Sequence, residues 1–167
     1  MKVLVSDSSV LIDLERGSLL EATFSLSDEF AVPDLLYEQE LKSYGGDRLV
    51  ALGLRIEELA GELVAQALGY RRIKPILSVP DSFALALAKA NGWTLLAGDK
   101  GLRELAAAEA VQCHGVLWLL DRLLDEDAAG AAALHAGLTA IAAHPRCRLP
   151  RPEIKIRLDR YAALCKK

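Results

Sequence analysis

Cysteines and long apolar runs are both scarce in this 167-residue sequence. The three cysteines, at positions 113, 147 and 165, are widely separated and odd in number, which favours a reducing compartment over a disulfide framework. No apolar run approaches the roughly 20 residues that a bilayer-spanning helix needs, and no cleavable signal pattern precedes the first predicted strand. We therefore expect one cytoplasmic domain over residues 1–167, with no membrane partner.

Several common catalytic motifs are also missing. No glycine-rich loop follows the first apolar run, which excludes a dinucleotide-binding or P-loop signature there. All three histidines lie after residue 113 and no Gly-x-Ser-x-Gly segment occurs, so a Ser-His-Asp hydrolase is not indicated. Cys113-His114 with His144 and Cys147 could be written as a zinc set, but neither pair has the usual ligand spacing. The chemistry therefore has to come from carboxylates.

Short apolar runs alternate with helical patterns through most of the chain. Four segments have the pattern of buried strands, namely residues 2–5, 30–33, 93–97 and 111–114. The alternation predicts an α/β fold, a three-layer α/β/α sandwich with a central parallel sheet. After the second strand we expect a helical hairpin, roughly residues 48–54 and 57–68, and then a break at 69–75. Residues 125–167 are predicted to form a helical and basic C-terminal extension of the same domain.

Acidic side chains come directly after two of these predicted strands. Asp7 follows the first strand and Asp99 follows the third. Because the carboxyl ends of parallel strands meet at one edge of a sheet, we expect these two side chains to lie close together. Asp81 begins the helix that leads into the Asp99 strand, and the first turn of that helix can approach the same edge.

A further acid comes from the helix that is predicted to begin at Asp34. It offers Glu38 and Glu40, which are two positions apart and so point to opposite sides of a helix. Glu40 follows Leu36 by one turn and adjoins Leu41, so it borders an apolar seam. Glu40 is the favoured candidate for the shared edge, and Glu38 is the alternate.

Carboxylates gathered at one edge repel one another, and without a cation some of them have to be protonated. A hard divalent ion removes that repulsion, and oxygen-only ligands select Mg²⁺ or Mn²⁺ over zinc. Such a site can activate water for in-line attack on a phosphodiester. Taken singly, each acid also has an ordinary explanation, since Asp81 suits the first turn of a helix, Asp99 a turn and Glu40 a solvated surface.

The segments around these acids resemble those of PIN-domain nucleases. Val5 to Ile12 is similar to the opening motif of that family, an Asp followed by Thr or Ser and then by Ser or Asn. Three later segments are similar to those that carry the second, third and fourth acids of the family, namely residues 32–41, 81–88 and 95–103. Ala97-Gly98 stands where a Thr is common. The resemblance spans roughly residues 2–120.

This resemblance implies a parallel-sheet sandwich with an acidic, metal-binding cleft. It implies that Asp7, Glu40, Asp81 and Asp99 are the catalytic acids and the ligands of Mg²⁺ or Mn²⁺, with Ser9 hydrogen-bonding near the metal. Small members of the family are mostly VapC-type toxins, ribonucleases that a cognate antitoxin holds inactive. We therefore expect a metal-dependent endoribonuclease, the toxin of a type II toxin–antitoxin pair. The alternatives are a PIN-type RNA-processing nuclease without an antitoxin, a receiver-type acidic pocket and an inactive protein-binding relative.

Positive charge is concentrated at the C-terminal end. Residues 1–145 hold 12 Lys or Arg against 21 Asp or Glu, whereas residues 146–167 hold 8 against 2. Such a split indicates an anionic partner, and six residues are candidate RNA contacts: Arg71, Arg72, Arg148, Arg151, Lys155 and Arg157. The tail could instead pair with nearby acids such as Asp125, Glu126 and Asp127, or form a homodimer interface. If the tail serves RNA alone, removing it after Pro145 should leave the melting temperature unchanged.

Overall fold

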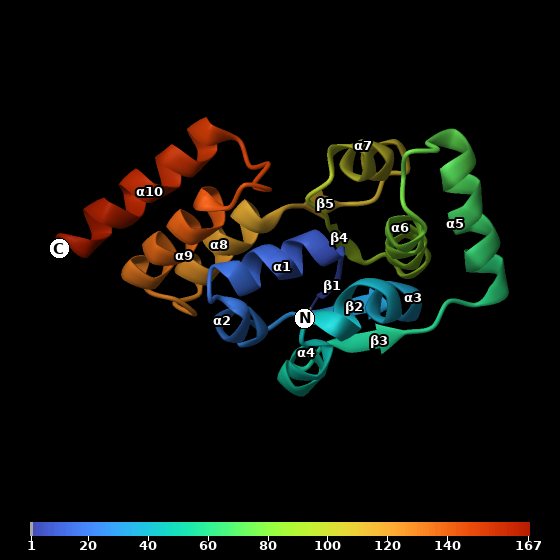
Figure 1. Cartoon of the computed structure of the whole chain (residues 1–167), viewed down its shortest axis with the longest axis horizontal. Coiled ribbons are helices and arrows are strands. Elements are labelled where there is room, and N and C mark those ends of the chain that lie inside the picture. Colours follow the sequence, from blue (N-terminus) through green and yellow to red (C-terminus); the bar gives the residue numbers. More distant parts are fainter. Residues whose placement is uncertain (1) are drawn as a thin grey trace. The chain divides into compact units, whose positions relative to one another are not determined.

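The computed structural model describes residues 2–167, and these residues fall into two compact units (Figure 1). The first unit contains the chain up to Val10 and Ser27–Gly115, and the second contains Leu11–Leu26 and Val116–Lys167. No helix among the described residues is long and apolar enough to cross a membrane. That the whole chain forms a single domain remains a prediction.

A five-stranded, all-parallel sheet forms the centre of the first unit. The order across the sheet is β3-β2-β1-β4-β5. The strands are β1 (Val3–Ser6), β2 (Glu29–Pro33), β3 (Arg55–Glu57), β4 (Thr94–Leu96) and β5 (Cys113–His114). Helices join the strands, and this is the predicted three-layer α/β/α fold with a central parallel sheet, which is confirmed.

The central strand β1 marks the point where the direction of winding changes. From β1 the chain moves outward through β2 to β3, and it then returns to place β4 on the other side of β1. Leu4 and Val5 of β1 are fully buried, as is Leu95 of β4, because both faces of a central parallel strand are covered. In open α/β sheets, ligands bind beyond the carboxyl ends of the strands at such a switch point.

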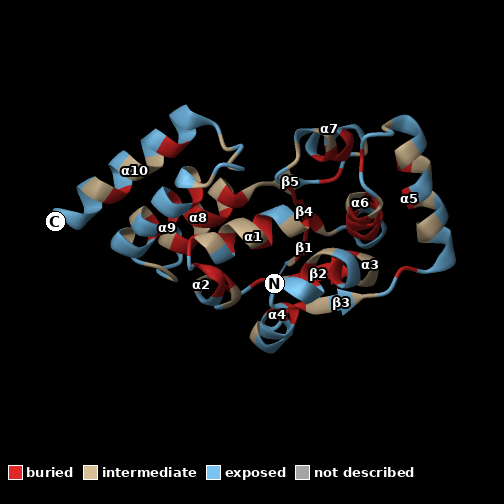
Figure 2. Ribbon diagram, in the orientation of Figure 1, coloured by how far each residue is buried: buried red, intermediate tan, exposed pale blue. Residues whose placement is uncertain are grey.

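The helix α6 (Val79–Asn91) packs against β1, β2 and β4 and is buried along most of its length (Figure 2). Its start is set by Ser78, whose Oγ accepts a hydrogen bond from the Asp81 backbone N–H at 3.1 Å. Its end is set by Gly92, which adopts the left-handed conformation with φ 65°. The other helices of the first unit are α3 (Asp34–Leu36), α4 (Gly46–Leu52), α5 (Gly61–Ile73) and α7 (Lys100–Ala108).

The predicted helical hairpin after the second strand is wrong in part. Residues Arg55–Glu57 form β3 instead, at the edge of the sheet next to β2. An edge strand needs no apolar run, and this one is held by Arg55, which pairs with Glu29 and with Glu57. The predicted break at residues 69–75 is also wrong in part, because α5 continues through Gly69 to Ile73. A single glycine is tolerated inside a helix.

The second unit is helical. Its elements are the end of α1 (Ser8–Arg16), then α2 (Leu20–Phe24), α8 (Val116–Asp125), α9 (Ala131–Ala143) and α10 (Arg151–Cys165). The helix α10 packs along α9, and Figure 2 shows it as largely exposed with short buried stretches. The buried side chains are Ile154 and Tyr161. A side chain at Gly137 could not fit, since its Cβ would lie 2.8 Å from the carbonyl oxygen of Gly17. The basic tail is therefore a packed helix.

Candidate active site

Asp7 lies at the carboxyl end of β1, at the switch point of the sheet, and is only 2% exposed. Its backbone N–H donates to the carbonyl oxygen of Leu96 at 2.8 Å, which extends the pairing of β1 with β4 past the last strand residue. Its carboxylate accepts the N–H of Val10 on Oδ1 at 3.0 Å and the N–H of Gly98 on Oδ2 at 2.8 Å. The Ser9 hydroxyl lies 2.9 Å from both oxygens. The position and orientation of this carboxylate are thus fixed by both flanking loops.

Burial raises the pKa of Asp7 from its ordinary value of 3.8 to about 6. The N–H groups of Val10 and Gly98 and the Ser9 hydroxyl oppose that rise because they stabilise the ionised form. The negative charge of Glu40 adds a smaller upward contribution. Asp7 is therefore an acid that exchanges its proton close to neutral pH without a cation nearby.

Ala97-Gly98 stands where a Thr is common in the family. The structure shows why a glycine is needed at position 98. A Cβ added at this position would lie 2.5 Å from the Ser9 Oγ. The hydroxyl would have to rotate, and its hydrogen bonds to Asp7 would be lost. The small residue lets the β4 loop approach Asp7 closely enough for its N–H to donate.

Asp81 lies in the first turn of α6, where the Ser78 cap fixes the start of the helix. Its pKa is raised from 3.8 to about 7, chiefly by burial. The negative charges of Asp7, Glu40 and Asp99 each raise it further, and a hydrogen bond with Ser78 lowers it. Asp7, Glu40 and Asp99 therefore lie near enough to Asp81 for their charges to raise its pKa.

Glu40 and Glu38 point to different surroundings. Residues Tyr37–Leu41 form one turn of π-helix after α3, and Glu40 accepts a hydrogen bond there from the Ser8 hydroxyl. Such π turns are frequent at functional sites. Glu38 is exposed and pairs with Lys42 at 3.1 Å. Of the two, Glu40 lies with the other acids, and its role as a metal ligand stays a prediction.

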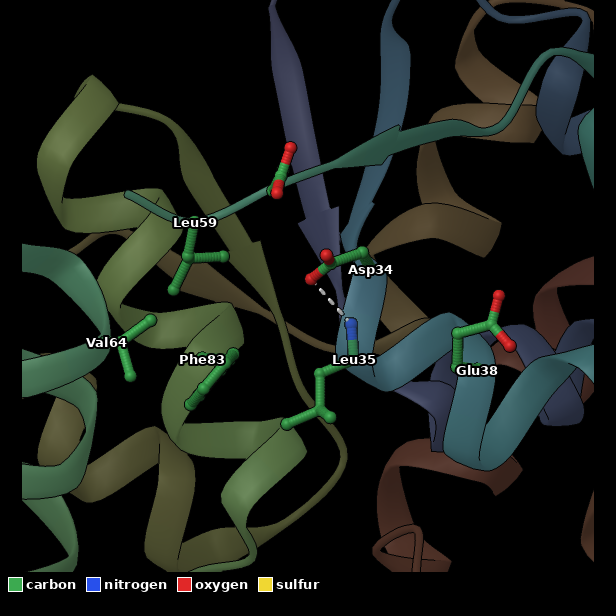
Figure 3. A pocket seen from close by; sticks show the side chains of 7 residues that line it. Asp34, Leu35, Glu38, Leu59, Val64 and Phe83 are labelled. Atoms are coloured by element: carbon green, nitrogen blue, oxygen red, sulfur yellow. Dashed lines mark hydrogen bonds between the residues drawn. The ribbon is translucent and has the colours of Figure 1, made fainter. Parts of the chain in front are cut away.

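Glu38 also lines a separate pocket, which Figure 3 shows from close by. Its apolar wall is formed by Leu35, Leu59, Val64 and Phe83. None of the four predicted catalytic acids lines this pocket.

Asp99 follows β4 and caps the start of α7. Its Oδ2 accepts the backbone N–H of Leu102 at 2.9 Å, which satisfies one of the free N–H groups of the helix start. The side chain is half-buried, and its charge is felt by Asp81. Asp99 therefore caps a helix, whereas the ordinary explanation from the sequence was a turn, and its charge also acts on Asp81.

The four carboxylates differ from a preformed metal cage. Among residues 2–167, no group of three or more His, Cys, Asp or Glu side chains converges tightly enough to hold an ion. Mg²⁺ keeps several of its waters and binds through one or two carboxylates together with substrate phosphates. An oxygen-only set of mutually repelling carboxylates, two with raised pKa values, fits an ion of that kind.

The comparisons with known proteins agree with this geometry. A family model described as DUF3368: PIN domain matches residues 3–161, nearly the whole chain. This chain belongs to the PIN-domain family. A PilT N-terminus domain protein from the hyperthermophilic archaeon Sulfolobus solfataricus P2 has a similar solved structure. The two structures superpose with a TM-score of 0.54 at 19% sequence identity, over 75% of this chain and 95% of that one. This likeness shows the fold alone. No curated protein matches this chain.

The role of one residue of this PIN domain, Ser8, was not predicted from the sequence. Ser8 orients Glu40, and its neighbour Ser9 orients Asp7, so both hydroxyls after the first acid serve carboxylates. The Ser8-Ser9 pair was the only signal for this. Cys113 lies on β5 near Asp7, and the pKa of its thiol is raised to about 11 by burial and by the charge of Asp7. It is therefore a protonated, unreactive thiol.

The candidate RNA contacts of the PIN domain differ in how far they are already engaged. Arg157 donates to both carboxylate oxygens of Asp121, at 2.9 and 2.7 Å, and Arg160 lies 3.7 Å from Asp125. Lys155 pairs with Asp159 on its own helix. The intramolecular pairing considered for the tail is thus present in the second unit. Among the remaining candidates, the guanidinium of Arg71 donates to the Leu77 carbonyl and that of Arg151 donates to the Ala142 carbonyl. Arg72 and Arg148 are exposed, as is Arg151. Their contact with RNA stays a prediction.

Proposed function

We propose that this PIN domain is a divalent-metal-dependent endoribonuclease. The observation that carries the proposal is the placement of Asp7 at the switch point of the sheet and of Asp81 in the first turn of α6, where burial and neighbouring negative charges raise both pKa values. A folded protein that gathers acids whose charges oppose one another has to relieve that repulsion. A divalent cation bound by these carboxylates would relieve the repulsion, and the same cation could bind a phosphodiester and activate water for its hydrolysis.

Asp7, Glu40, Asp81 and Asp99 would hold Mg²⁺ or Mn²⁺, which would supply an activated water and neutralise charge on the phosphate. The other residues hold these acids in place. Ser9 and the Gly98 N–H orient Asp7, and Ser8 orients Glu40. The caps at the starts of α6 and α7 fix Asp81 and Asp99. Orientation of this kind keeps ligands close to a productive geometry before the substrate arrives.

A cleavage assay with a matched control tests the proposal. The wild-type protein should cleave single-stranded RNA when Mn²⁺ or Mg²⁺ is added and should be inactive with EDTA. Asp81→Asn should lose cleavage by more than about 100-fold, as expected when a metal-activating carboxylate is removed. Glu38→Gln removes the same charge from the same unit, outside the acid group, and should retain wild-type activity. Metal-independent cleavage, or equal losses in both variants, would contradict the proposal.

We further propose that this nuclease is the toxin of a type II toxin–antitoxin pair. Induced expression of the wild-type chain alone should arrest growth, and Asp81→Asn should not. An active nuclease whose expression leaves growth unchanged would instead indicate an RNA-processing enzyme without an antitoxin.

A further inference from the structure

Lys74, directly after α5, reaches across to the first turns of α7. Its Nζ donates to the Gly101 carbonyl oxygen at 3.3 Å and lies 2.7 Å from a Glu104 carboxylate oxygen. Its segment, residues 74–78, connects α5 to α6, the helix that carries Asp81. A lysine from one side of the acid group is thereby held against the helix that Asp99 caps.

Gly101 brings Lys74 and Asp99 to the same point of α7. A Cβ added at Gly101 would lie 3.1 Å from Asp99 Oδ2 and 3.6 Å from Lys74 Cε. The Lys74 side chain therefore lies close to Asp99 at the start of α7. Arg71, in the last turn of α5, already donates to the Leu77 carbonyl.

The partner that Lys74 has in the free protein is easily released. The Lys74 side chain is 29% exposed and that of Glu104 is 53% exposed, and ion pairs in such positions contribute little to stability. The Glu104 carboxylate therefore stays in contact with water when Lys74 leaves. The pair can therefore open without leaving a buried charge behind.

We propose that Lys74 is a phosphate-contacting residue of this site, whose ammonium group exchanges Glu104 for the RNA backbone next to Asp99. The inference rests on the proposed function for the identity of the substrate. A cluster of four carboxylates repels a phosphodiester, and a flexible cation at its border offsets that repulsion where the strand enters. The contact is made to phosphate, so it serves binding without selecting a base.

Binding of a fluorescent single-stranded RNA, with Ca²⁺ in place of Mg²⁺ or Mn²⁺, tests the inference separately from cleavage. Lys74→Ala and Lys74→Gln should both raise the Kd about tenfold, as expected for one lost charged hydrogen bond. Each should also make the slope of log K against log salt shallower by about 0.7, the contribution of one phosphate on a single strand. The glutamine variant keeps a donor for the Gly101 carbonyl, so a loss shared by both variants cannot come from that tether.

Two control variants change the surroundings or the charge of Glu104. Lys100→Ala removes an equal charge near Glu104 and should change the Kd less than twofold, because Lys100 is 84% exposed and holds Glu104 from a distance. Glu104→Gln should leave RNA binding unchanged or tighter, since it frees Lys74. An unchanged Kd and salt slope in both Lys74 variants, or an equal loss in Lys100→Ala, would overturn the inference. If RNA binding depends on Lys74 but the protein never cleaves RNA, the nuclease activity is refuted and the phosphate contact is retained. If the wild-type protein binds no RNA, both are refuted.

Discussion

Replacing Asp81 with Asn should stabilise the metal-free protein at pH 8 and change its stability little at pH 4. The pKa of Asp81 is about 7 in the folded protein against an ordinary 3.8, so the folded state binds the proton more tightly than the unfolded state does. The corresponding stability is fully present below pH 3.8 and is lost as pH rises through about 7. Asparagine resembles the protonated acid at every pH and avoids that loss.

The size of the effect follows from the shift in pKa. About three pKa units correspond to about 4 kcal/mol between the two protonation states. Because the side chain is partly exposed and titrates together with Asp7, solvent screening and coupling reduce this to about 2 kcal/mol at pH 8. For a chain of this length that gain corresponds to a melting temperature about 4–8 °C higher than that of the wild-type protein.

Urea denaturation in EDTA at pH 4, 6 and 8 measures the difference. The chain has two tryptophans, and Trp93 belongs to the first unit whereas Trp118 belongs to the second. A Trp118→Phe background makes the fluorescence report on the unit that contains Asp81. Glu38→Gln serves as the control, because it removes the same charge from an exposed position outside the acid group.

Addition of Mn²⁺ at pH 8 should cancel the stability advantage of Asp81→Asn over the wild-type protein. An ion at 100 times its Kd stabilises the folded state by about 2.7 kcal/mol, and Asp81→Asn should lose most of that gain because it lacks one of the proposed ligands. The reasoning is refuted if Asp81→Asn is as stable as wild type, or less stable, in EDTA at pH 8. That result would mean that burial and the neighbouring acids do not raise the pKa of Asp81.

Three further outcomes are expected. Glu40→Gln should weaken Mn²⁺ binding at least tenfold in a calorimetric titration, while Glu38→Gln should barely change it. The reverse order would show that the wrong glutamate was placed with the acids. Gly98→Ala should displace the Ser9 hydroxyl from the Asp7 carboxylate and cost about 1–2 kcal/mol of stability in denaturant titration. In a protein that already carries Ser9→Ala, Gly98→Ala should cost almost nothing more, and additive losses would contradict this coupling. Removing residues 146–167 should lower the free energy of unfolding by about 3–5 kcal/mol in thermal or chemical denaturation, because two buried side chains of α10 are lost, and an unchanged melting temperature would restore the view of a tail that serves RNA alone.

The amino-acid sequence alone was sufficient to predict the fold class and the family. Periodicity separated buried strands from helices, and those strands form the predicted parallel sheet. Ser78 and Gly92 marked the two ends of α6 because capping groups act within a single turn. Asp7 and Asp99 could be placed near one another because each follows a parallel strand, and the topology brings β1 and β4 together.

Other features depended on contacts between residues far apart in the chain. The edge strand β3 carries no apolar pattern and is held by pairing with β2 and by Arg55. Which of Glu38 and Glu40 lies with the other acids depends on a π turn and on the Ser8 hydroxyl, 32 positions from Glu40. The basic residues of α10 read as a free cationic strip, whereas Arg157 is bound to Asp121.

The acidity of the site was also decided by the tertiary structure. Asp7 is buried, accepts an N–H from Gly98, which is 91 positions away, and feels the charge of Glu40. Helical and strand patterns are set by neighbours within a few residues, and for that reason they can be identified in a sequence. The pKa of a carboxylate is set by desolvation and by charges that only folding brings near it, so the sequence named the acids and the three-dimensional arrangement determined how they ionise.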